Sequence, residues 1–276
     1  MSTSILIQIY EVQTPSEAEK LIALGVHHIG SVVVSKKSWK VPEIRDTVKR
    51  IHGAGGRSSL IPLFSDLDAI SLMLDYYRPD VVHFCEALSW QNEHGEAREE
   101  LVLLQKNVKK RFPEIEIMRS IPIRQPGISD DFSTLDLARM FEPVSDYFLT
   151  DTLIAKGSGS LSDHQPVKGF IGITGKICDW DVAAELVEQS RIPVILAGGI
   201  TPDNVFDGIV HVQPAGVDSC TGTNAVDAQG PIRFKKDFAK VKRLIDAVHR
   251  AEKSLGPGMK MKGFKGSSEK NQVYKT

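Results

Sequence analysis

The sequence predicts an α/β protein in which eight strand-then-helix units close into a single (β/α)8 barrel of the TIM-barrel class. Strand-sized apolar runs alternate with helical patterns along the chain, and no break between them resembles a linker. The 276 residues would fit two small domains, but they also match the ~250 residues typical of such a barrel. Crossover-length helices imply parallel strands. No G-x-G-x-x-G follows the first run, which disfavours an open doubly wound sheet.

The first four units each pair an apolar run with a polar-faced helix. A Thr14 N-cap with Pro15 at the first helical position begins the first helix, which ends near Gly25. The glycines of 53–56 mark a turn after the second helix. The predicted strands are 5–10, 29–34, 59–64 and 81–85, and their helices are 14–25, 41–52, 69–77 and 93–111.

The last four units follow the same alternation. The predicted strands are 115–121, 147–149, 193–196 and 216–219, and their helices are 134–141, 180–190, 202–211 and 235–253. A long loop over 151–176 contains the flexible segment 157–160, which could act as a lid. The barrel should occupy 1–254, because residues 255–276 are rich in Lys, Gly and Ser and predict a flexible, disordered basic tail.

Composition narrows the function. The 34 basic and 35 acidic residues give a net charge of −1, which argues against a nucleic-acid binder. No apolar run approaches the ~20 residues that cross a membrane, and Met1–Ser4 has no basic, signal-like start. Three scattered cysteines form no disulfide framework and no metal spacing. We expect a cytoplasmic protein without a metal.

Barrel chemistry is expected at the carboxyl ends of the strands. Two glycines, Gly198 and Gly199, follow the seventh run, and Thr221-Gly222 follows the eighth. Thr201 is expected to cap the next helix, with Pro202 at its first position. Either loop alone reads equally well as a turn. Both together, in the two usual phosphate-binding positions, favour a phosphate site made of main-chain donors.

Four motifs in the second half of the chain resemble one family. They are Phe148-Leu-Thr-Asp-Thr152, Gly172-Ile-Thr-Gly-Lys176 with Asp179-Trp180, Leu196 to Val205 with its Ala-Gly-Gly-Ile-Thr-Pro-Asp-Asn core, and Gly216 to Gly222. In this order they resemble phosphoribosylanthranilate isomerase. The likeness is specific over residues 146–249. Over residues 1–145 the order of elements agrees with the family, but individual residues agree less well. It implies a (β/α)8 barrel that performs an Amadori rearrangement in tryptophan biosynthesis on a small phosphorylated sugar, without metal or organic cofactor.

The resemblance also assigns roles. Such a rearrangement needs an acid to open the sugar ring and a base to take a proton from the neighbouring carbon. By resemblance Asp151 is the acid and Asp218 bonds sugar hydroxyls. The phosphate-binding residues are Gly175, Gly198, Gly199, Thr221 and Gly222.

The first half of the chain departs from the family. The family base is a Cys in a Lys-Ile-Cys-Gly run, which here reads Gln8-Ile-Tyr10-Glu11. Tyr10, with an ordinary pKa near ~10, is a poor base, so His83, Cys85 and Glu11 are alternative candidates. A hydrogen-bonded core histidine and an inert buried thiol are the plainer interpretations of His83 and Cys85.

The residues that would bind the anthranilate part of the substrate also differ from those of the family. The family Arg after the second strand corresponds to about Trp39, with Lys36, Lys37 and Lys40 nearby. Trp39 or Trp90 could stack on a flat substrate.

Two other functions stay open on the sequence alone. The same phosphate-binding barrel could act on a different phosphorylated sugar or metabolite, as the missing thiol and Arg suggest. It could also bind a phosphorylated metabolite, or a protein partner, without catalysis. Neither nucleic acid nor membrane is an expected partner. The chain could be a monomer or a homodimer.

Overall fold

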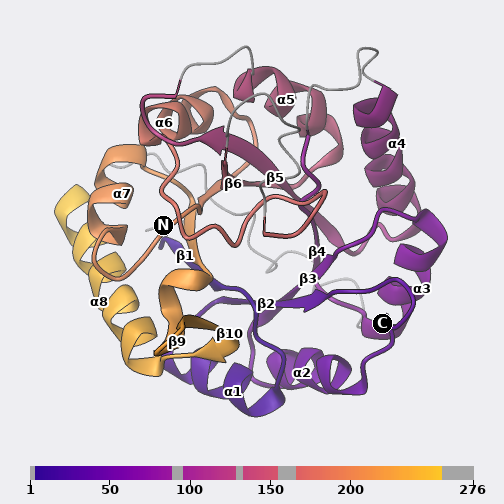
Figure 1. Ribbon diagram of the computed structural model, residues 1–276, viewed down its shortest axis with the longest axis horizontal. Helices are drawn as coiled ribbons and strands as arrows, with labels where there is room; N and C mark the ends of the chain where they lie inside the picture. The colour runs from indigo at the N-terminus through magenta and orange to yellow at the C-terminus, as the bar shows by residue number, and fades with distance from the viewer. Residues whose placement is uncertain (1–3, 89–95, 129–132, 155–165, 257–276) are drawn as a thin grey trace, which may run out of the picture.

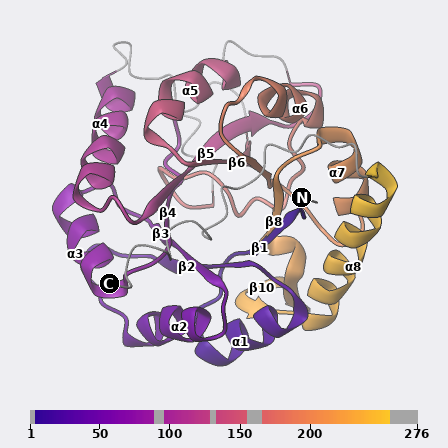
Figure 2. The ribbon, with the colours of Figure 1, turned by 180° about the vertical axis from the view of Figure 1, so that it is seen from behind.

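Eight parallel strands close into a barrel in chain order, with β1 (Leu6–Ile9) hydrogen-bonded to both β2 (His28–Val33) and β8 (Gly216–Ser219). The computed structural model describes residues 4–88, 96–128, 133–154 and 166–256. Helices surround the barrel on all sides, as both views show (Figures 1 and 2). The predicted fold class is confirmed.

The remaining elements follow the predicted alternation. The other barrel strands are β3 (Arg57–Pro62), β4 (Val81–Phe84), β5 (Glu116–Arg124), β6 (Tyr147–Leu153) and β7 (Val194–Leu196). The helices are α1 (Pro15–Leu24), α2 (Pro42–Gly53), α3 (Leu67–Tyr77), α4 (Glu96–Arg111), α5 (Thr134–Phe141), α6 (Trp180–Gln189), α7 (Val205–Val212) and α8 (Phe238–Leu255). A 3₁₀ turn, η1 (Glu142–Val144), follows α5.

Short polar side chains fix where the helices begin. Thr14 accepts a hydrogen bond from the Glu17 amide at 3.4 Å, and Pro15 opens α1 as expected. Asp179 and Asp237 cap α6 and α8 in the same way. Each such cap satisfies backbone donors that the first helical turn leaves unpaired.

The sixth strand is longer than the sequence suggested. It was expected to end at residue 149, but it pairs with β5 in unbroken register as far as Leu153. Asp151 therefore lies within β6, opposite Pro122, and not in the loop after it. The following loop is described from residue 166 onward. The glycine-serine segment 157–160 lies outside the described residues, as do Trp90 and the tail from 257.

Two expected helix starts are wrong. The seventh helix begins at Val205, not Pro202, because Asn204 folds back: its side chain accepts from the Thr201 amide and donates to the Gly199 carbonyl. The eighth begins at Phe238, since a hairpin of β9 (Asn224–Asp227) and β10 (Gly230–Lys236) precedes it. This hairpin lies beside α1 and α8 (Figure 1).

Side chains of alternate parity fill the two sides of the barrel wall, as the pleat requires. His83 and Cys85 share one parity, and both line the barrel interior near its mouth. Phe84 and Arg119 have the opposite parity and are fully buried against the helices. There Arg119 lies over the Phe141 ring and pairs with Glu86 at 2.5 Å.

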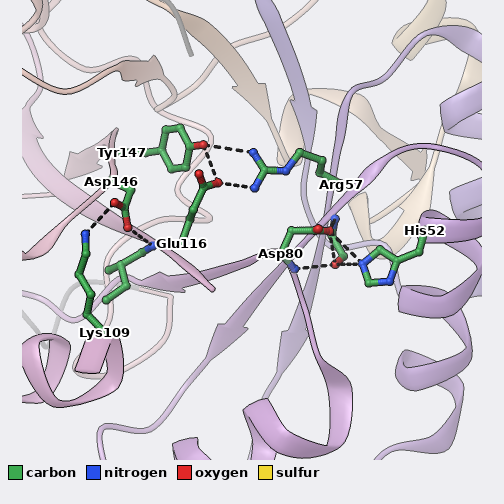
Figure 3. A network of polar contacts seen from close by, with 9 residues as sticks. His52, Arg57, Asp80, Lys109, Glu116, Asp146 and Tyr147 are labelled. Atoms are coloured by element: carbon green, nitrogen blue, oxygen red, sulfur yellow. Dashed lines mark hydrogen bonds and ion pairs between the residues drawn. The ribbon is translucent and has the colours of Figure 1, made fainter. Parts of the chain in front are cut away.

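Ionic pairs tie together the amino-terminal ends of the strands (Figure 3). Arg57 bonds both Glu116 and the Tyr147 hydroxyl. His52 lies 2.9 Å from the Asp80 carboxylate, which also accepts from the Ser58 amide at 2.7 Å. In barrels of this kind the amino-terminal rim contributes stability and the opposite rim carries chemistry.

Candidate active site

A cavity at the carboxyl ends of the strands has two compartments. One, of about 350 Å³, lies over β7 and β8, and the other, of about 530 Å³, lies over β1 to β4 and β6. Asp151, Ile173, Asp218 and Cys220 line both. The cavity can therefore hold one elongated ligand that passes two carboxyl groups.

The smaller compartment brings together every residue that the sequence assigned to phosphate. Gly175, Gly198, Gly199, Thr221 and Gly222 line it. No Lys, Arg or His is among its lining residues. Among the described residues, no protein acceptor takes the amide N–H of Gly175 or Gly199. Gly175, Gly198 and Gly199 have positive φ, and a concave lining of main-chain donors of this kind suits an anion.

Asp151 projects from β6 between the compartments. Its Oδ1 accepts from the Thr152 amide at 2.8 Å. The chain of the β6–α6 loop passes so close that a Cβ on Gly172 would fall 2.4 Å from Oδ2, so only glycine fits there. Burial, only partly offset by the Thr152 hydrogen bond, raises the pKa of Asp151 to about 7. The group can thus carry a proton near neutral pH.

Asp218 projects from β8 on the same side of the barrel. It lies opposite Gln8 in the β1–β8 register and interacts with that side chain. Its buried Oδ1 has no hydrogen-bond partner among the described residues. Burial and the nearby Asp151 charge outweigh Gln8 and raise the pKa of Asp218 to about 8. A free buried oxygen at the compartment boundary suits a ligand hydroxyl.

The larger compartment is mainly apolar, and part of the β6–α6 loop covers it. Val167, Phe170 and Ile171 from this loop line it together with strand residues such as Ile61 and Leu149. The loop is held to the end of β4: Ile171 donates to the Cys85 carbonyl at 2.9 Å, and the Ala87 amide donates to Gly169 at 2.8 Å. In Figure 1 the segment after residue 165 crosses the barrel opening. This segment, 166–173, is called the cover segment below.

Tyr10 and His83, both expected at the site, line the larger compartment but are bonded to each other. The Tyr10 hydroxyl lies 2.8 Å from His83 Nδ1 and also bonds Ser59. His83 Nε2 lies 2.8 Å from the Ser120 hydroxyl. Burial raises the pKa of Tyr10 well above its ordinary value and lowers that of His83 to about 3. Both are uncharged at neutral pH.

Glu11, directly after β1, is 1% exposed and lines the same compartment. Its Oε1 accepts from Arg233 Nε at 2.7 Å, and Arg233 Nη2 bonds the same oxygen. Arg233 comes from β10. Sequence reasoning missed it because it predicted a helix from residue 235 and no strand before that helix. The alternation of Ile232 and Phe234 with Arg233 and Lys235 was the available signal for a strand.

The residues after β2 that were expected to meet a carboxylate lie elsewhere. Lys36 pairs with Asp66 at 2.7 Å, at the start of α3. Trp39 packs edge-on against Tyr76, and Lys40 lies over the same ring. None of these side chains lines either compartment. The structure therefore does not bring the predicted aromatic and lysine side chains to the site.

The described part of the chain offers no metal site of three or more His, Cys, Asp or Glu side chains. Cys85, Cys178 and Cys220 are all free thiols. Within the same residues, no helix has the length and apolar character needed to cross a bilayer.

Sequence comparison relates this chain to enzymes of one name. Residues 113–247 match the family model for N-(5'phosphoribosyl)anthranilate (PRA) isomerase. A relative of that name from Methanocella arvoryzae is 32% identical over 139 residues, which are 50% of this chain and 56% of the relative. Another from Methanosarcina mazei is 34% identical over 146 residues, 53% of each chain. The chain thus spans about half the length of these two relatives.

Matches that cover more of the chain have lower sequence identity. The N-(5'-phosphoribosyl)anthranilate isomerase of Gloeothece citriformis is 24% identical over 248 residues, covering 88% of this chain and 94% of that one. The crystal structure of phosphoribosyl anthranilate isomerase from Thermotoga maritima superposes with a TM-score of 0.63 at 18% identity, over 89% and 99% of the two chains. A structure of such an enzyme holding reduced 1-(o-carboxyphenylamino)-1-deoxyribulose 5-phosphate gives 0.61, also at 18% identity and the same coverage. These structures share the fold.

Proposed function

This chain belongs to the phosphoribosylanthranilate isomerase family, and we propose that it catalyses the Amadori rearrangement of phosphoribosylanthranilate in tryptophan biosynthesis. The observation that carries the proposal is the two-compartment cavity, with two buried carboxyl groups between an apolar compartment and a smaller one that no cation lines. The glycines and Thr221 that line the smaller compartment are called the phosphate cradle below, after the role proposed for them. This order of groups matches a substrate with phosphate, sugar and aromatic ring in sequence.

Asp151 is the proposed acid. Ring opening needs a proton delivered to the ring oxygen, and a carboxyl group with a pKa of about 7 holds one at neutral pH. A bound phosphate dianion would favour the protonated form further, since a like charge disfavours ionisation. Asp218, with its free Oδ1, is the proposed partner of the sugar hydroxyls. Gly175, Gly198, Gly199, Thr221 and Gly222 are the proposed phosphate ligands, which place the reacting carbon by remote binding energy.

A second candidate function is the same chemistry on another phosphoribosyl amine. It is favoured by the larger compartment, in which no Lys or Arg is among the lining residues to meet the carboxylate of anthranilate. The lysines after β2 are turned to Asp66 and Tyr76 instead. A substrate whose ring carries no negative charge would fit this lining better.

Turnover of phosphoribosylanthranilate by the purified chain tests the proposal. Asp151→Asn removes the proton donor and keeps the shape, so kcat should fall by about 10²- to 10⁴-fold. Inhibition by inorganic phosphate should change less than about threefold, because the phosphate cradle is intact. Asp246→Asn, an exposed change on α8, is the matched control and should keep wild-type rates.

Lack of turnover by the wild-type chain, with inorganic phosphate still raising its melting temperature, would reject the isomerase reaction on this substrate and favour the second candidate. Absence of any effect of phosphate would reject the cradle as well.

A reducing, cytoplasmic setting is the proposed location. It fits a described chain whose three cysteines are unpaired, with thiols that burial keeps protonated.

A further inference from the structure

The proposed reaction needs a base that faces Asp151 across the sugar, and the positions of the strands limit where it can lie. The phosphate cradle stands over β7 and β8. In the closed barrel these two strands are flanked by β6, which carries Asp151, and by β1. A sugar held by its phosphate over β7 and β8 would therefore have the ends of β6 and β1 on its two sides. The base is best sought at the end of β1.

Tyr10 and His83 are poorly placed for this task. The Tyr10 hydroxyl points away from β8, toward Ser59 on β3 and His83 on β4. A Cβ on Gly30 would fall 1.9 Å from the Tyr10 ring, so the ring is pressed against β2. Both His83 nitrogens are engaged, one by Tyr10 and one by Ser120. These hydrogen bonds occupy both nitrogens of His83 and direct the Tyr10 hydroxyl toward Ser59 and His83.

The thiols and the second aspartate are protonated at neutral pH, so they are not available to take up a proton. Burial raises the pKa of Cys85 well above its ordinary value, and Cys220 is likewise kept protonated by burial. Asp218 lies on β8, beside β1, and lines both compartments. With a pKa near 8 it holds a proton for most of the neutral range.

Glu11 has the geometry that the others lack. It follows β1, it is 1% exposed, and it lines the larger compartment that Asp151 also lines. Arg233 holds Oε1 with two donors, while no N–H or O–H group among the described residues donates to the buried Oε2; the protonated Cys220 thiol also interacts with the Glu11 carboxylate. Its backbone has φ of 62°, unusual for a residue other than glycine. Strain and an unpaired buried oxygen together are typical of a functional position.

We propose that Glu11 is the catalytic base, that its Oε2 takes the proton from the sugar carbon, and that Arg233 of the β9–β10 hairpin is its positioning residue. The proposal rests on the proposed isomerase function and assigns the role that the family gives to a cysteine. Arg233 would fix the carboxylate with Oε1 turned away and Oε2 free.

The proton balance closes within the site. Asp151 gives its proton to the ring oxygen as the C1–O bond breaks and the nitrogen lone pair forms the C1=N bond. Glu11 takes the proton on C2, the C–H electrons form C1=C2, and the C=N electrons return to nitrogen. Glu11 then returns its proton to C1, and the C2 hydroxyl loses its own proton to solvent, from which Asp151 is reprotonated. No oxidant or co-reactant is needed.

Glu11→Gln tests the base directly. The amide keeps the shape and a contact to the cavity but takes up no proton, so kcat should fall by about 10²- to 10⁴-fold. The inhibition constant of inorganic phosphate should change less than about threefold. Glu19→Gln, on the exposed face of α1, is the matched control and should keep the wild-type rate. Aspartate tolerates a positive φ and keeps a carboxylate. The kcat of Glu11→Asp should therefore exceed that of Glu11→Gln by at least about tenfold.

The outcomes separate this proposal from the function it rests on. A wild-type chain that does not turn over the substrate would overturn the isomerase proposal and this role with it. A wild-type chain that does, alongside an equally active Glu11→Gln, would overturn the role of Glu11 alone. Should Glu11→Gln fail to fold, as melting would show, folded Glu11→Asp with activity no better than Asp151→Asn would overturn it as well.

Arg233 is tested by the split between kcat and KM. Arg233→Met leaves the carboxylate without its partner, so kcat should fall at least about tenfold while KM and phosphate inhibition stay within about threefold. Arg233→Lys should restore part of the loss, because one cationic donor returns. Equal losses in both variants, or a change confined to KM, would reject a positioning role.

Discussion

At the scale of single residues, two buried carboxyl groups distinguish the site from the rest of the barrel. Asp151 and Asp218 have pKa values raised to about 7 and about 8, chiefly by burial. Ordinary folding would exclude such groups or pair them with cations, because an isolated buried charge is costly. The structure instead leaves the Asp218 Oδ1 unpartnered. This is the cost in stability expected of a site prepared for a ligand.

Asp218→Asn should therefore stabilise the chain at alkaline pH. A carboxyl group with a raised native pKa contributes most below its unfolded value near ~4, and that contribution is lost as pH rises through the native value. Removing the ionisable group should raise the melting temperature by several degrees at pH 9 and change it little at pH 5. Thermal unfolding at both pH values measures this. A variant less stable than wild type at pH 9 would contradict it, and Asp246→Asn should show no difference.

At the scale of elements, two segments outside the repeated units complete the cavity. The β9–β10 hairpin delivers Arg233 to Glu11, and its Lys236 bonds the Cys220 carbonyl and Asn224. The cover segment 166–173 places Phe170 and Ile171 over the larger compartment. Both segments are inserted between a strand and its helix, where this fold carries its variation in specificity.

Phe170→Ala is the test of the cover segment. It removes an apolar wall of the larger compartment and should raise KM for phosphoribosylanthranilate by about tenfold, the scale of losing part of one aromatic contact. Inhibition by inorganic phosphate should stay unchanged, because the smaller compartment does not include Phe170. If affinity for the substrate and inhibition by phosphate weakened to the same extent, the cover segment would contribute to folding more than to binding.

At the scale of the whole molecule, the two rims of the barrel respond oppositely to pH. Burial opposes ionisation of Asp80, but hydrogen bonds from His52 and the Ser58 backbone outweigh it and lower its pKa to about 2. Its contribution to stability is present above pH ~4 and is lost as pH falls toward 2. The raised pKa values of Asp151 and Asp218 cause the loss on the alkaline side. From these three groups, stability should be greatest near pH ~4 and should fall as pH rises from there through the native pKa values of Asp151 and Asp218.

Asp80→Asn isolates the acidic side of this curve. The variant should be less stable than wild type at pH 6, since the ionic contact with His52 is gone (Figure 3). The difference in melting temperature should shrink steadily between pH 4 and pH 2.5, because the unfolded wild-type chain takes up a proton on Asp80 below pH ~4, whereas the folded chain does so only near pH 2. A melting-temperature difference that stays constant across this range would show that Asp80 does not cause the loss of stability at acidic pH.

The sequence by itself determined the barrel and predicted which residues meet in the smaller compartment. Alternating strands and helices admit few topologies, and glycines with Thr221 at the ends of β7 and β8 lie close together in any closed barrel. Asp151 was found by its position in a local motif, although its strand runs to Leu153. Local sequence is informative wherever the partners of a residue are adjacent in the chain or fixed by the fold.

Only the tertiary structure decided which groups are free to act. Tyr10, at the position of the family base, and His83 were both candidates on the sequence, yet each is hydrogen-bonded to a serine on another strand, Ser59 and Ser120, far away in the chain. Arg233 bonds Glu11, which lies 222 positions earlier in the chain. It does so from a hairpin that the sequence analysis did not predict, because the last helix was expected to begin at Lys235. Burial and long-range hydrogen bonds set the protonation of a side chain, and neither can be obtained from the residue's own neighbours in sequence.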